Sequence, residues 1–372
     1  MTQKLPSTEN RSGALDLLRF LAISVVFFGH YVEAFNYANQ IVPANLKFIP
    51  LFRYGCTSII VFYMVSGYTV TMTSMKRGLK DFFIIRLSRL YPLFWVSCLA
   101  AFILQRFVSD HTYLPGTSIK ILLANLTMMP GLFGYPLINP VFHTLLIELT
   151  FYFLIGFIIL FKLWKKLIYV ITFLLIFCLA DAIFLTKIAY VFFTPFIAGM
   201  LFFLINIGYD KPIKLYSLLA VNYVCSLMSA IPLSGPFKNI STTPHEYDKW
   251  FFMVVLTLIY IVFLLTTGKK IVIKSNPVIQ TLGKVVYPLY LFHLYFLYLY
   301  WYFSDTIQPQ VLLISLFLLA IMVSWALHVL VEKPFSKFTY NTLVWVTDSI
   351  KIKKLFYKLK RFAKPSTYYR SA

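Results

Sequence analysis

Arg19 and His30 lie in the first long apolar segment of the chain, which covers residues 14–35. They are eleven positions apart. This spacing is about three turns plus 20° of an α-helix, so both side chains lie on one helix face, about 16 Å apart along it. Histidine, with an unperturbed pKa of about 6.5, can take a proton from a hydroxyl group, and arginine can hold a phosphate. The structural alternative is that Arg19 anchors the helix at the lipid headgroups while His30 packs between helices.

Glu148 is a carboxylate within another apolar segment, at residues 141–162. A carboxylate at membrane depth needs a cationic partner or a proton. Arg19, His30 and Arg86 are the candidate partners. We expect Glu148 either to act directly in catalysis or to form a structural ion pair.

Arg86 and Arg89 stand one helical turn apart at the start of the apolar segment 83–107. Two arginines in this arrangement can grip a phosphate-rich ligand. Anchoring of a helix at the cytoplasmic face often produces the same pair, so the motif alone is weak.

Ser66 and Gly67 interrupt the apolar segment 55–75. Glycine allows a close helix approach or a bend. The Gly-x-Ser-x-Gly pattern of a nucleophile elbow is missing from the sequence, so Ser66 is not expected to be a nucleophile.

Other functional motifs are missing from the sequence. The histidines are scattered, with neither a His-x-x-x-His pair nor a cysteine cluster, so we expect no metal site. His111, His245 and His328 show no partner pattern. Walker A and Gly-x-Gly-x-x-Gly sequences are not present, so ATP-driven transport and nucleotide-dependent redox chemistry lack support.

The composition is that of a membrane protein. Of the 372 residues 60% are hydrophobic, 19% are aromatic and 13% are charged, whereas soluble domains carry about 25% charged residues. These values exclude a soluble enzyme, a nucleic-acid-binding protein and a disordered chain. The formal net charge of +21 comes from basic residues in the loops between apolar segments, which is typical of a membrane face next to anionic lipid.

The pattern of apolar segments predicts an all-α, polytopic integral membrane protein with about ten transmembrane helices. Lysine and arginine are concentrated in alternate loops, so the positive-inside rule predicts that both termini are cytoplasmic. An even number of spans agrees with that orientation. The expected spans lie near residues 14–35, 55–75, 83–107, 141–162, 166–186, 188–207, 213–232, 250–267, 285–303 and 310–331.

The spans form one membrane domain, at residues 1–336, because the sequence contains no repeat and no second domain. Residues 337–372 form a basic cytoplasmic C-terminal tail. An amphipathic surface helix is expected within the tail, at residues 345–363.

Six motifs in chain order resemble the membrane-bound acyltransferase family 3, whose members O-acylate or O-acetylate surface carbohydrates. The resemblance spans residues 11–336, and its strongest part is the Arg-x10-His signature formed by Arg19 and His30. The other five are the aromatic-rich stretch Phe62–Tyr68, Arg86-x-x-Arg89 followed by Tyr91-Pro92, the block Thr144–Glu148 with Tyr152, Tyr290–His293 and Val331–Pro334. Two positions depart from the family pattern: His143 replaces a common Trp, and Val286 replaces a frequent Ser.

The resemblance implies transfer of an acyl group, most often acetyl, from an acyl-CoA such as acetyl-CoA. The implied acceptor is a hydroxyl of a carbohydrate or a lipid-linked glycan. It implies an enzyme of the lipid bilayer, in the bacterial cytoplasmic (inner) membrane, that uses no metal and no nucleic acid.

The resemblance also suggests roles for individual residues. His30 is the expected general base, and Glu148 is expected to orient His30 or to offset an arginine. Acylation of the histidine itself is the other chemical route. The expected acyl-CoA-binding residues are Arg19, Arg86, Arg89 and Ser66.

Two other functions remain open. The acceptor could be a small molecule instead of a glycan. The chain could also be a secondary transporter, because arginine, histidine and glutamate within membrane spans serve proton-coupled transport too.

Overall fold

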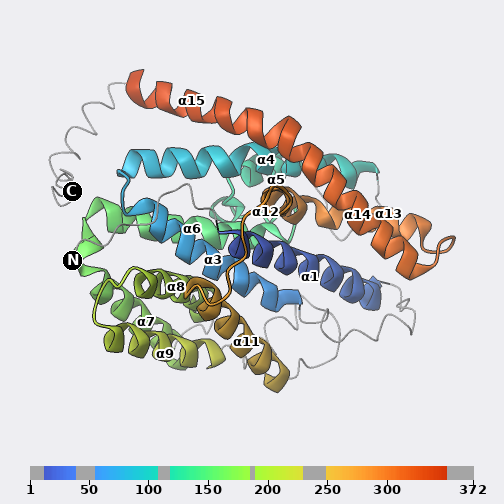
Figure 1. Ribbon diagram of the computed structural model, residues 1–372. Coiled ribbons are helices and arrows are strands. Elements are labelled where there is room, and N and C mark those ends of the chain that lie inside the picture. Colours follow the sequence, from blue (N-terminus) through green and yellow to red (C-terminus); the bar gives the residue numbers. More distant parts are fainter. Residues whose placement is uncertain (1–11, 39–54, 108–117, 185–188, 229–248, 350–372) are drawn as a thin grey trace. The chain divides into compact units, whose positions relative to one another are not determined.

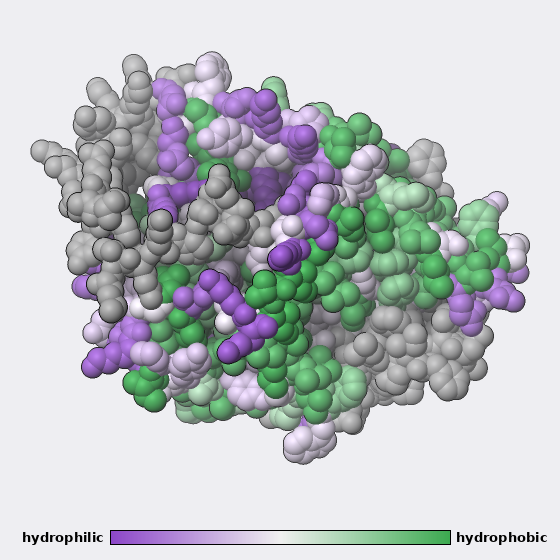
Figure 2. All heavy atoms as spheres, viewed as in Figure 1, coloured by the Kyte–Doolittle hydropathy of each residue, from purple (hydrophilic) through white to green (hydrophobic). Residues whose placement is uncertain are grey.

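The computed structural model describes residues 12–38, 55–107, 118–184, 189–228 and 249–349. Every regular element in these ranges is a helix (Figure 1), which confirms the predicted all-α class. Apolar side chains cover much of the surface in view (Figure 2). Such exposed apolar surface suits a protein that is surrounded by lipid.

Within the described residues, each predicted span coincides with helical structure. In the described part of the chain, 7 helical segments are long and apolar enough to cross a membrane. Three further apolar helices are shorter, at Ser58–Ser74, Phe192–Asn206 and Pro212–Met228. The count of about ten spans and the cytoplasmic termini therefore stay predictions.

Two compact units make up the chain. Unit 1 takes its described residues from Met1–Lys76 and Leu163–Gly283, and unit 2 takes them from Arg77–Lys162 and Lys284–Tyr368. Arg19, His30 and Ser66 belong to unit 1, whereas Arg86, Arg89 and Glu148 belong to unit 2.

Unit 1 is a bundle of regular helices around a close crossing of α3 and α8. Its helices are α1 (Gly13–Ala38), α3 (Ser58–Ser74), α7 (Leu167–Phe184), α8 (Ala189–Asn206), α9 (Pro212–Met228) and α11 (Lys249–Thr267), with the 3-10 turns η2 (Gly55–Thr57) and η4 (Leu163–Lys166).

Glycines allow the crossing of α3 and α8. A Cβ on Gly67 would lie 2.2 Å from the carbonyl oxygen of Phe196, and one on Gly199 would lie 2.0 Å from that of Met64. Real Cβ atoms do not approach oxygen so closely, so only glycine fits at either position. The close helix approach predicted for Gly67 is confirmed, and α8 is its partner.

Unit 2 is built around the long helix α4. Its elements are α4 (Leu79–Phe107), α5 (Ile119–Leu126), η3 (Pro130–Phe133), α6 (Phe142–Leu160), α12 (Pro277–Phe292, from Lys284 on), η6 (His293–Tyr295), α13 (Phe296–Phe303), α14 (Pro309–Leu327), the π-helical turn η7 (His328–Glu332) and α15 (Lys333–Ser349). Helix α15 packs along α4 (Figure 1), and Lys80 pairs with Asp348 across them at 2.6 Å.

The described residues between α4 and α6, 118–141, include a helix that was not predicted from the sequence. This short helix is α5, and the buried Asn125 holds the chain that follows. The Asn125 amide donates to the Pro136 carbonyl at 2.9 Å, and its Oδ1 accepts from the Ile138 backbone at 3.0 Å. Trp95 of α4 donates to the Leu126 carbonyl at 3.0 Å, which ties the segment to the helix bundle.

Helical structure also continues beyond the predicted end of the membrane domain. Helix α14, the turn η7 and α15 follow one another without a gap from Pro309 to Ser349. The predicted boundary at residue 336 thus falls inside α15. The amphipathic helix expected at residues 345–363 lies largely outside the described residues.

Candidate functional site

Helix α1 carries the predicted Arg19–His30 pair. The helix is unbroken from Gly13 to Ala38, so both residues lie on a single helix as the spacing predicts. Both side chains are half-buried. A guanidinium and an imidazole are thus presented at different depths along one helix.

Arg19 is oriented towards α3. Its Nη2 donates to the Thr69 hydroxyl at 3.4 Å, near the long limit of a hydrogen bond. The same hydroxyl donates to the Val65 carbonyl of its own helix at 2.8 Å, so it is in place to accept from arginine.

The turn of α1 that bears His30 is fixed by its neighbours. A Cβ on Gly55 would lie 3.3 Å from the Cα of Gly29, so η2 lies directly against this turn. The rings of Phe27 and Tyr31 stack at 4.3 Å on the buried side of the helix. These contacts hold the backbone of His30 in place.

Ser66 is almost fully buried, one residue before the glycine at the α3–α8 crossing. Its side chain lies in the interior of unit 1. Its role in acyl-CoA binding stays a prediction.

Arg86 and Arg89 have different surroundings in unit 2. The Arg86 side chain is 8% exposed and lies over the rings of Tyr152, at 5.5 Å, and Phe82, at 5.9 Å. Arg89 is exposed. Residues three apart on a helix differ by about 60° in direction, and here that difference separates a packed guanidinium from an accessible one.

Glu148 is joined to the buried arginine through Tyr152. The phenol of Tyr152 donates to Glu148 Oε1 at 2.7 Å, and Glu148 is close enough to Arg86 to interact with it electrostatically. Of the three expected partners, Arg86 therefore lies near Glu148 within unit 2. Arg19 and His30 belong to the other unit.

His293 lies at a break in the ninth predicted span. The sequence predicts one helix, whereas α12 ends at Phe292 and a 3-10 turn leads into α13. His293 is fully buried, and its Nδ1 is 2.7 Å from the Tyr290 carbonyl. Because a carbonyl only accepts, Nδ1 carries the proton and Nε2 is the basic nitrogen of the neutral ring.

His143 has the same backbone pairing at the start of α6. Its Nδ1 is 2.7 Å from the Pro140 carbonyl, which again leaves Nε2 as the basic nitrogen. The next residue, Thr144, is hydrogen bonded through its hydroxyl to the Tyr290 phenol of α12. The turns that bear His143 and His293 thus both lie near the Thr144–Tyr290 hydrogen bond, which joins α6 to α12.

The pair formed by His328 and Glu332 was not predicted from the sequence. Nδ1 of His328 lies 2.7 Å from Glu332 Oε2 across the π-helical turn η7. The signal is a His-x-x-x-Glu spacing, which puts two side chains on one helix face. Glu332 is buried and acts electrostatically on Tyr287, whose phenol donates to the Leu90 carbonyl at 2.7 Å, next to Arg89.

Within the ranges that the structure describes, no three His, Cys, Asp or Glu side chains come together.

Comparison with known proteins agrees with the motif reading. A family described as an acyltransferase domain matches residues 12–329. Nodulation protein 10 of Rhizobium leguminosarum bv. viciae is 26% identical over 182 residues, which are 43% of this chain and 48% of that protein. The chain thus spans about half the length of this curated relative. No solved structure matches.

Proposed function

Since the chain belongs to the membrane acyltransferase family 3, whose domain matches residues 12–329, we propose that it transfers an acyl group from acyl-CoA to a carbohydrate hydroxyl. Acetyl is the proposed acyl group. The proposed acceptor is a surface polysaccharide or a lipid-linked glycan, and the proposed location is the bacterial inner membrane.

The observation that carries this proposal is the unbroken helix α1 with Arg19 and His30 on it. A hydroxyl is a poor nucleophile at neutral pH, so its attack on a thioester needs a base. His30 takes the proton while the hydroxyl oxygen attacks the thioester carbonyl carbon. The carbon–sulfur bond then breaks, and the coenzyme A thiolate leaves and takes up a proton.

Arginines are the proposed partners of the coenzyme A phosphates, through charge-assisted hydrogen bonds. The exposed Arg89 suits direct contact with a ligand, and Arg19 is half-buried on α1, with its Nη2 3.4 Å from the Thr69 hydroxyl. Arg86 is packed on Tyr152 and next to Glu148. We assign Arg86 and Glu148 to the positioning of this part of α4. Arg89 is the proposed contact residue for the coenzyme A phosphates.

The test uses membranes from cells that express the chain, supplied with radiolabelled acetyl-CoA. Label is counted in the glycan, lipid and small-molecule fractions for the wild type and for His30→Ala. Ser24→Ala is the matched control, because Ser24 lies on the same helix and its hydroxyl donates to the Phe20 carbonyl there, at 2.8 Å. We expect label that depends on His30 but not on Ser24.

The fraction that carries the label identifies the acceptor class. Label that persists at the wild-type level in His30→Ala contradicts the proposed base. A wild-type chain that transfers no label to any fraction favours the transport interpretation over acetyl transfer.

A further inference from the structure

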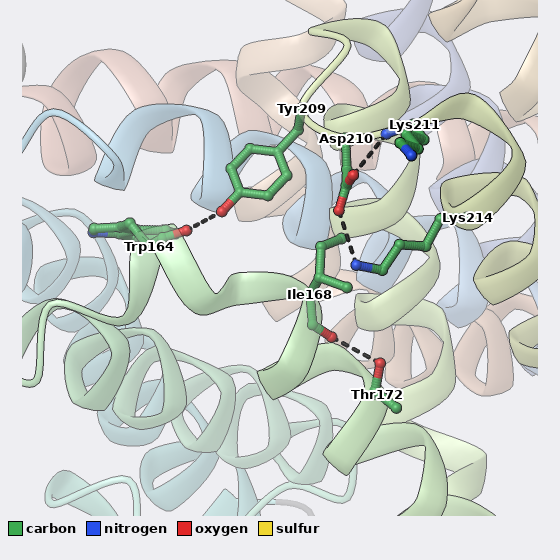
Figure 3. Close-up of polar contacts among 7 residues, drawn as sticks. All are labelled: Trp164, Ile168, Thr172, Tyr209, Asp210, Lys211 and Lys214. Carbon is green, nitrogen blue, oxygen red and sulfur yellow. Dashed lines mark hydrogen bonds and ion pairs between the residues drawn. The ribbon is translucent and has the colours of Figure 1, made fainter.

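A cluster of lysines forms where α7, α8 and α9 of unit 1 are connected. The turn η4 comes just before α7, and residues 207–211 connect α8 to α9. The phenol of Tyr209 donates a hydrogen bond to the Trp164 carbonyl, which joins the two connections (Figure 3). The exposed lysines at this junction, the lysine rim from here on, are Lys165, Lys166, Lys211 and Lys214.

One carboxylate lies within the lysine rim. Asp210 accepts from the Lys211 backbone at 2.7 Å and from Lys214 Nζ at 3.0 Å (Figure 3). These two donors, the backbone one first, lower the pKa of Asp210 below its usual range, so it stays ionised at neutral pH. Among the described side chains of this junction, Lys166, Lys211 and Lys214 outnumber the Asp210 carboxylate by two positive charges.

Aromatic and apolar side chains lie next to these charges. Lys214 Nζ is 5.5 Å from the centre of the Tyr169 ring, which is 70% exposed. Ile213 is 74% exposed, and Tyr216 is also exposed one turn along α9. Exposed apolar side chains continue along the two packed helices, at Phe173 and Ile176 of α7 and at Val221 and Val224 of α9.

We propose that the lysine rim binds the headgroup phosphate of an anionic phospholipid whose acyl chains lie along α7 and α9. A phospholipid at a membrane surface meets cations at its headgroup, then tyrosine rings, and then apolar side chains along its acyl chains. The groups at this junction follow the same order. A free phosphate ion would use the lysines alone and would leave the apolar wall without a role. This lipid site is independent of the proposed acyl transfer.

The test is a titration of the purified full chain, in a neutral detergent, with phosphatidylglycerol. Binding is followed by native mass spectrometry. The test variant is Lys166→Gln/Lys211→Gln, in which the backbone N–H at position 211 still bonds Asp210. The control is Lys270→Gln/Lys274→Gln, which removes two exposed lysines elsewhere in the same unit.

We expect about a five-fold loss of affinity for each rim lysine removed, and wild-type affinity in the control. Phosphatidylcholine is expected to bind much more weakly than phosphatidylglycerol. Equal losses in the two variants, or equal binding of the two lipids, overturn the site. Displacement of the lipid by an equal concentration of glycerol 3-phosphate shows a phosphate site without a lipid contribution, which overturns the proposal too.

Discussion

Unit 1 and unit 2 bring helices together in different ways. In unit 1, α3 and α8 are regular helices whose backbones touch at Gly67 and Gly199. In unit 2 two predicted helices depart from α-helical geometry, with a 3-10 turn at His293 and a π-helical turn from His328 to Glu332. Each departure contains a histidine whose Nδ1 is hydrogen bonded to a residue three or four positions away.

The difference has a physical cause. Lipid gives two apolar helices no hydrophobic reason to associate, so close van der Waals contact between small residues is the available attraction. A polar side chain within a membrane span needs a hydrogen-bond partner. An irregular turn can bring such a partner within reach. Gly67 and Gly199 thus bring α3 and α8 of unit 1 into contact, whereas the irregular turns of unit 2 give His293 and His328 hydrogen-bond partners.

The largest expected effect is at the crossing in unit 1. Gly199→Ala puts a Cβ within 2.0 Å of the Met64 carbonyl oxygen, so α3 and α8 must separate. We expect a loss of about 3 kcal/mol of stability, measured as thermal unfolding in detergent. Gly78→Ala is the control, because a Cβ there meets no atom within 4 Å. Equal melting temperatures for the two variants would mean that α3 and α8 accommodate the added methyl group. Close backbone contact would then not be what holds these helices together.

Arg86 and Arg89 separate packing from ligand contact within unit 2. Arg86→Ala removes the guanidinium over Tyr152 and a cation near Glu148, so we expect about 2–3 kcal/mol of destabilisation. Arg89→Ala changes an exposed side chain and is expected to cost less than about 0.5 kcal/mol. Its expected effect is a higher KM for acyl-CoA. Thermal unfolding and acyl-transfer kinetics of both variants check this; the reverse pattern would exchange the two roles.

Variants of the His328–Glu332 pair test whether the hydrogen bond across the irregular turn stabilises unit 2. His328→Gln removes the ring nitrogen that lies 2.7 Å from Glu332 and is expected to destabilise by about 1–2 kcal/mol. Glu332→Gln keeps an acceptor oxygen, so we expect a smaller loss. Both are read by thermal unfolding. Wild-type stability of His328→Gln would show that the pair is dispensable.

The smallest expected effect concerns Ser324, one turn before His328 on α14. Its hydroxyl is fully buried, and among the described residues it has no hydrogen-bond partner. Ser324→Ala removes this unsatisfied group, so stability is expected to stay unchanged or to rise by less than about 1 kcal/mol. A clear drop in the melting temperature would point to a partner for the hydroxyl in the folded protein.

Features that depend on the local chain were predictable from the sequence. A run of about 20 apolar residues forms a helix in lipid because its backbone groups must bond within the segment, so the predicted spans coincide with helices. The placement of Arg19 and His30 on one helix follows from the same periodicity. The motifs indicated the acyltransferase family because each is a short pattern of neighbouring residues, which the sequence shows directly.

Features that depend on a neighbouring segment were decided by the tertiary structure. The sequence shows that Gly67 permits a close helix approach. Only the fold identifies the contacting surface, which is formed by Gly199 and Phe196 of α8. The repeat of 3.6 residues puts Arg86 and Arg89 on adjoining faces, while packing against α6 decides which one is buried. The His-x-x-x-Glu spacing was present in the sequence at His328, and burial of Glu332 inside the helix bundle made the pair significant. Partner choice depends on distances in space, and these follow from how the helices pack.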